Sequence, residues 1–104
     1  ARLLQEHILA ALAEAGYQAR DRGVMPDRVL AMEGEPGKHL VLIGPCEERC
    51  VRPSQMPGAL TESLFITHTE EEELLRREEI LEALAQAHLE AIEAYVVEVE
   101  GLAK

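Results

Sequence analysis

Apolar residues recur with helical spacing over the C-terminal third of the chain, from Thr69 to about Val99. No proline or glycine interrupts the run before Gly101, which is predicted to follow the helix end as its C′ residue. Residues 95–100 also alternate as a strand does, but no turn residue separates them from the helix, so the pattern favours helix. Steps of three, four and seven residues place the following side chains on one helix face: Leu74, Leu81, Leu84, Ala91, Ile92, Tyr95 and Val99.

The predicted long helix begins with four consecutive glutamates, residues 70–73. Acidic side chains suit a first helical turn, because the unpaired backbone N–H groups there carry partial positive charge. A capping box is expected, either from Thr69 and Glu72 or from Thr67 and Glu70. Ion pairs one turn apart are predicted between Glu72 and Arg76 and between Glu73 and Arg77.

A shorter amphipathic helix is predicted at the start of the sequence, over residues 2–15. Gly16 supplies the left-handed residue that ends it, and Tyr17 is placed to fold back onto the last turn, as in a Schellman motif. The apolar face of this helix is predicted to consist of Leu4, Ile8, Ala11, Leu12 and Ala15.

Between the two helices the pattern predicts five strands. The clearest hairpin covers residues 28–43, and its second strand is apolar on both sides, which is typical of a central strand. Strands that follow one another without crossover helices pair antiparallel. The expected fold is therefore a single two-layer α+β domain over residues 1–104, with an N-terminal helix, a long C-terminal helix and an antiparallel sheet of four or five strands. The predicted strands are residues 17–22, 28–33, 38–43, 47–52 and 63–67.

Charge is strongly uneven along a chain whose formal net charge is −10. Residues 62–100 hold twelve glutamates against two arginines, whereas residues 17–61 carry six charges of each sign. So acidic a chain repels phosphate backbones, which makes nucleic acid an unlikely partner. The absence of asparagine gives a thermophile-like composition. No apolar run is long enough to span a bilayer, and a cytoplasmic location with no membrane contact is expected.

Cys46 and Cys50 are the residues whose spacing most resembles a site. A metal site would need a second pair of ligands, for which His39 and His68 stand at predicted strand ends. A disulfide between the two cysteines is a second alternative. Two unbonded thiols are favoured over either arrangement. Zinc-binding cysteines more often have two or four residues between them, whereas three residues separate Cys46 from Cys50. Disulfides are rare in the cytosol.

The length of the C-terminal helix predicts self-association. A helix to residue 99 would measure about 45 Å, whereas a domain of this size has a radius of gyration of about 13 Å. No catalytic or cofactor-binding motif is present, and no cofactor is expected. The sequence therefore favours a non-enzymatic, homodimeric protein-interaction, adaptor or regulatory module, with a metal- or redox-responsive protein as the alternative. Interface residues are predicted to be Leu81, Leu84, His88, Ile92 and Tyr95.

Overall fold

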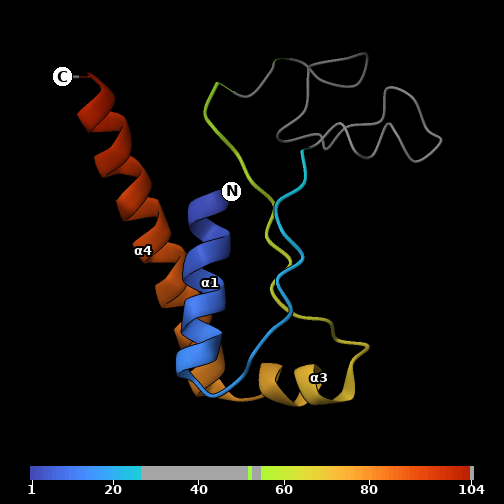
Figure 1. The fold of residues 1–104 in the computed structure, drawn as a ribbon. Coiled ribbons are helices and arrows are strands. Elements are labelled where there is room, and N and C mark those ends of the chain that lie inside the picture. Colours follow the sequence, from blue (N-terminus) through green and yellow to red (C-terminus); the bar gives the residue numbers. More distant parts are fainter. Residues whose placement is uncertain (27–51, 53–54, 104) are drawn as a thin grey trace. The chain divides into compact units, whose positions relative to one another are not determined.

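The computed structural model describes residues 1–26, 52 and 55–103. The chain divides into two compact units, one formed by residues 1–23 and 61–104 and the other by residues 24–60. The described residues of the second unit, 24–26, 52 and 55–60, are exposed, and none of them lies in a helix or strand. The first unit contains α1 (Arg2–Glu14), α3 (Thr69–Leu75) and α4 (Glu78–Ala103), as Figure 1 shows.

The predicted α+β fold class is wrong, because the described part of the chain contains helices and no strand. Residues 17–22 and 63–67, both predicted to be strands, have an irregular backbone. The strands predicted over residues 28–33, 38–43 and 47–52 lie outside the described residues, apart from Arg52. The first unit is therefore a helical fold, and the expected antiparallel sheet is corrected accordingly.

Hydrogen bonds to side chains accompany the irregular backbone of these two segments. The Asp21 carboxylate accepts from the Gln5 amide and from the Gly23 backbone N–H, both at 2.8 Å, which closes a local turn. The Phe65 backbone N–H donates to Glu71 Oε1 at 3.0 Å. Two backbone N–H groups, that of Gly23 just after the first segment and that of Phe65 within the second, thus donate to carboxylates and not to a neighbouring strand.

Helix α1 ends in the predicted Schellman motif. Gly16 has φ of +96°, a conformation that costs little only for glycine. Its N–H donates to the Ala13 carbonyl at 3.0 Å, and the Tyr17 N–H donates to the Leu12 carbonyl at 2.8 Å. These two bonds define the motif, with Ala15 as the C-cap residue.

The predicted continuous C-terminal helix is interrupted at Arg76 and Arg77, between α3 and α4. The Arg77 carbonyl accepts from the N–H groups of Ile80 and Leu81 at 3.1 and 3.2 Å, so the α4 ladder begins there. Neither glycine nor proline marks the break. The physical reason is packing, because the change of direction places two leucines of α3 against the core, and these are Leu74 and Leu75.

Neither predicted capping box forms at the start of α3. The N-cap residue is His68, whose Nδ1 accepts from the Glu71 backbone N–H at 3.4 Å. The imidazole therefore takes the place that a threonine hydroxyl was expected to fill. Three glutamates lie in the first turn of α3, where the sequence predicted acidic side chains.

Of the two predicted ion pairs, only one forms. Arg76 binds the Glu72 carboxylate at 2.7 Å, which confirms the i,i+4 pair. Arg77 instead binds Glu79 at 2.7 Å, because the helix break separates it from Glu73. The prediction failed where it assumed a single helix.

Helix α4 continues through residues 95–100, so the preference for helix over strand in this segment is confirmed. It also passes Gly101 and ends at Ala103, which corrects the predicted C′ role of Gly101. Gly101 does not have positive φ, in contrast to Gly16. A glycine therefore ends α1, whereas another lies inside α4.

The core of the first unit lies between α1 and the first half of α4, which run antiparallel side by side (Figure 1). No polar side chain is buried in the described part of the chain. Fully burying one large apolar side chain contributes roughly 1.5–3 kcal/mol. The largest fully buried side chains are Leu12 and Ile80, one from each helix. The buried residues are Ile8, Leu12, Ile80, Leu84, Ala87 and Ala91.

Candidate protein-interaction surface

A row of exposed apolar side chains runs along nearly the whole of α4, and we call it the α4 stripe. Steps of four, four, three, four and three residues keep its members on one side of the helix. Apart from Ala85, which is also exposed, their exposed fractions run from 42% at Val99 to 56% at Ile92. The α4 stripe consists of Leu81, Ala85, Leu89, Ile92, Val96 and Val99.

The α4 stripe lies next to the buried face of the same helix and is not part of it. Ile80 and Leu84 pack against α1, and each is followed directly by a stripe residue, Leu81 and Ala85. Consecutive residues of an α-helix project about 100° apart. The apolar surface of α4 is therefore wider than α1 covers, and the uncovered part is the stripe.

The structure separates the five predicted interface residues into different environments. Leu81 and Ile92 belong to the α4 stripe, and Tyr95 lies beside it with 40% of its surface exposed. Leu84 is buried in the core. The fifth residue, His88, is half-buried.

Hydrogen bonds within the chain hold the His88 ring. Its Nδ1 lies 2.6 Å from the Leu84 carbonyl oxygen, which can only accept, so Nδ1 carries a proton. Its Nε2 lies 3.0 Å from the hydroxyl oxygen of Thr61, which can donate to a neutral ring or accept from a protonated one. His88 therefore joins α4 to the segment that precedes α3.

A second polar contact fixes α3 to the end of α1. The Tyr17 hydroxyl donates to Glu71 Oε2 at 2.9 Å, while the other oxygen of the same carboxylate accepts from the Phe65 N–H. Partial burial of the phenol, followed by this hydrogen bond, raises the pKa of Tyr17 above its ordinary value. The guanidinium of Arg22 lies over the Phe65 ring, 5.1 Å from its centroid.

The residues predicted for a metal site are only partly described. Cys46, Cys50 and His39 lie outside the described residues. His68, the fourth candidate, uses its Nδ1 to cap α3. Across the described ranges, no group of three or more His, Cys, Asp or Glu side chains has the arrangement that holds a metal ion.

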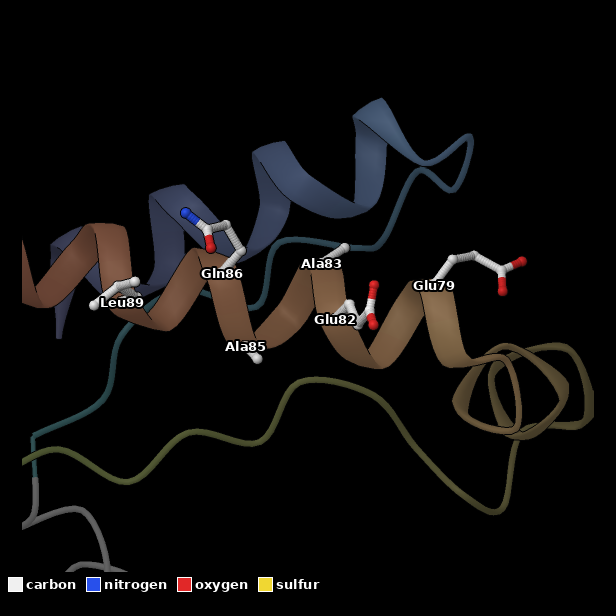
Figure 2. Close-up of a pocket in the computed structure, with 6 residues that line it drawn as sticks. All are labelled: Glu79, Glu82, Ala83, Ala85, Gln86 and Leu89. Carbon is white, nitrogen blue, oxygen red and sulfur yellow. The ribbon is translucent and has the colours of Figure 1, made fainter.

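Two shallow depressions mark the surface of α4. Figure 2 shows the first, whose labelled lining residues all come from α4: Glu79, Glu82, Ala83, Ala85, Gln86 and Leu89. The second lies between α1 and α4 and is lined mainly by alanines, together with His7, Glu14, Gln86 and Glu90. Their linings provide no serine or cysteine nucleophile, and the first depression shares Ala85 and Leu89 with the α4 stripe.

Helix α4 carries negative charge and contains no lysine or arginine. Its only ion pair to α1 in the described part of the chain joins Glu98 to Arg2 at 3.2 Å, while Arg2 also binds Glu6 at 3.1 Å. The helix contains seven glutamates, Glu78, Glu79, Glu82, Glu90, Glu93, Glu98 and Glu100.

Sequence reasoning did not identify Leu89 and Val96 as surface residues of α4. The signal was present in their spacing, because both fit the series that runs from Leu81 to Val99. It was obscured because α4 is apolar over more than one face.

No helix in the part of the chain that the structure describes is both long enough and apolar enough to cross a membrane. Comparison with known proteins finds no matching family model, no matching curated protein and no matching solved structure. The α4 stripe is therefore the feature from which a function is argued.

Proposed function

We propose that this chain is a non-enzymatic protein-interaction module that binds an amphipathic helix along the α4 stripe. The observation that carries the proposal is the continuous row of exposed apolar side chains from Leu81 to Val99 on a helix whose other apolar face is already occupied. Single exposed apolar residues are normal on protein surfaces, but contiguous apolar patches usually mark interaction sites.

The geometry of the α4 stripe favours a helical ligand. Its members are spaced by three and four residues, which is the spacing at which the side chains of one helix pack against those of another. The distance from Leu81 to Val99 is about 27 Å, or five helical turns. The ligand helix belongs either to a second copy of the chain, as the sequence predicted, or to another protein.

Two neighbouring valines provide a matched test of the α4 stripe. Val96 belongs to the stripe, whereas Val97 is on another side of the same helix and is 68% exposed. Val96→Asp places a charge in the proposed interface, while Val97→Asp adds the same charge outside it. The probe is a synthetic three-heptad helix with leucine at both core positions and glutamine along its edges, labelled for fluorescence anisotropy.

We expect the probe to bind the wild-type chain and Val97→Asp, and to lose at least about tenfold in affinity for Val96→Asp. Light scattering of the same three proteins measures whether the chain also associates with itself. If the probe does not bind and the chain stays monomeric, or if both variants behave alike, the proposal fails.

We also expect a cytoplasmic location, which fractionation of the source cells would check.

A further inference from the structure

We propose that the helix bound by the α4 stripe is a basic one from another protein, with lysines or arginines along the edge that faces the glutamates of α4. The inference rests on the proposed function and specifies its ligand. Charged side chains border the stripe, and they take no part in the apolar packing.

The border of the α4 stripe on the side away from the buried face of the helix is mainly acidic but also contains Gln86 and Val97. Glu82, Glu93 and Glu100 each follow a stripe residue directly and so project about 100° further around α4. All three are exposed, and within the described residues none of them forms an ion pair. A helix seated on the stripe would place one of its edges beside this row.

A second copy of α4 is a poor match for this border. Because α4 contains no lysine or arginine, pairing two stripes would bring glutamates toward glutamates in either direction. Like charges along the edges of paired helices weaken association, and opposite charges there select the partner. The acidic border therefore selects against self-pairing and in favour of a basic edge.

The same border argues against a membrane surface or a nucleic acid as the ligand. Amphipathic helices that bind membranes carry lysine and arginine beside their apolar face, because cell membranes display anionic lipids. Nucleic acids are also negatively charged, so their phosphate backbones would repel the glutamates of this border. An apolar row edged with glutamate fits a basic amphipathic helix of a protein.

The test uses the full chain and three forms of the synthetic three-heptad helix, which differ only at their edges. One form carries lysine, one carries glutamine and one carries glutamate. We expect the lysine form to bind about tenfold or more tightly than the glutamate form, from several exposed charge pairs acting together. Raising the salt concentration to about 0.5 M should remove most of this preference, because exposed charges are screened at short range in such a solution.

Charge-matched variants of the chain locate the effect. The triple variant Glu82→Gln, Glu93→Gln, Glu100→Gln removes the border, whereas Glu14→Gln, Glu70→Gln, Glu73→Gln removes the same charge from exposed positions on α1 and α3. We expect the border variant to lose the preference for lysine over glutamate edges and the control variant to keep it. Circular dichroism of both variants establishes that the helices persist.

The failures of the two proposals are distinguishable. If all three peptides bind with equal affinity and Val96→Asp abolishes the binding of each peptide, the α4 stripe remains the interface. The proposal of a basic partner is then wrong. If the lysine peptide binds Val96→Asp as well as wild type, its attraction is unspecific, and the inference is overturned. A dimer that dissociates in Val96→Asp would show that the second copy is the occupant and would overturn the inference as well.

Discussion

The two halves of α4 are alike in local structure and different in surroundings. Residues 78–91 contain all of the buried side chains of this helix, whereas residues 92–102 contain none. Helix α1 has 13 residues and α4 has 26, so the buried contacts of α1 are with the first half of α4, and α1 reaches the second half through the Arg2–Glu98 ion pair (Figure 1). The second half is nevertheless as apolar, with Ile92, Val96 and Val99 on the stripe. The comparison shows that an apolar position in this helix does not identify a core position.

The largest expected difference is between two isoleucines of α4. Ile80 is fully buried and Ile92 is 56% exposed, so the same substitution tests both environments. Ile80→Ala should lower the free energy of unfolding by about 2–5 kcal/mol, because it leaves a cavity between α1 and α4. Ile92→Ala should change it by less than about 0.5 kcal/mol. Urea unfolding followed by circular dichroism measures both values.

Equal losses of unfolding free energy for Ile80→Ala and Ile92→Ala would contradict the finding that only the first half of α4 is buried. A large loss for Ile92→Ala that depends on protein concentration would instead indicate an interface formed by a second copy. Repeating the unfolding curves at two concentrations separates these results.

Two glycines extend the comparison to the helix ends. Gly16→Ala should destabilise the chain by about 1–2 kcal/mol, because the +96° φ of Gly16 is unfavourable for a residue with a Cβ atom. Gly101→Ala should stabilise α4 by up to about 1 kcal/mol, because alanine is the better helix former and nothing lies within 4 Å of the added Cβ. Thermal unfolding by circular dichroism reports both changes. Opposite signs are required, and matching signs would contradict the assigned backbone conformations.

A smaller, pH-dependent difference is expected at Tyr17. Its pKa in the folded chain is above the ordinary value of 10.0, first through partial burial and then through the Glu71 carboxylate. A raised folded pKa means that the neutral phenol stabilises the fold below the ordinary value and that this contribution is lost as the pH rises through the folded pKa. Tyr17→Phe should therefore lower the urea midpoint at about pH 8, by an amount that shrinks as the pH rises past the ordinary pKa of 10.0 and through the raised folded pKa.

Tyr95→Phe is the control for this experiment, because Tyr95 lies on the second half of α4 with no hydrogen bond to Glu71. Each variant retains one of the two tyrosines. Titration of the remaining phenol by ultraviolet absorbance therefore shows which tyrosine has the raised pKa, and we expect Tyr17. If the difference in urea midpoint between wild type and Tyr17→Phe became larger at alkaline pH, it would contradict the assigned hydrogen bond.

Features that depend on a few neighbouring residues could be predicted from the sequence. Examples are the Schellman ending at Gly16 and Tyr17, the pair of Glu72 with Arg76 and the helical conformation of residues 95–100. The helix break at Arg76 and Arg77 could not, because no residue there disfavours helix and the cause is the packing of two leucines from α3.

The candidate surface was predicted in part. Leu81 and Ile92 were expected at an interface and belong to the α4 stripe, whereas Leu84 was expected there and lies in the core. Periodicity places all three on the broad apolar side of one helix, within about 100° of one another. It does not state how much of that side a neighbouring helix covers.

The sequence by itself determined where α1 lies and how it ends, that the C-terminal region is helical and that this region carries the negative charge. These properties follow from spacing, glycine and composition, which act within one or two turns. Only the tertiary structure decided which face of α4 is buried, where the C-terminal helix is interrupted and that residues 17–22 and 63–67 do not form strands. Those outcomes depend on contacts between residues far apart in the chain, because α1 covers one face of α4 and leaves the α4 stripe on the adjacent face exposed.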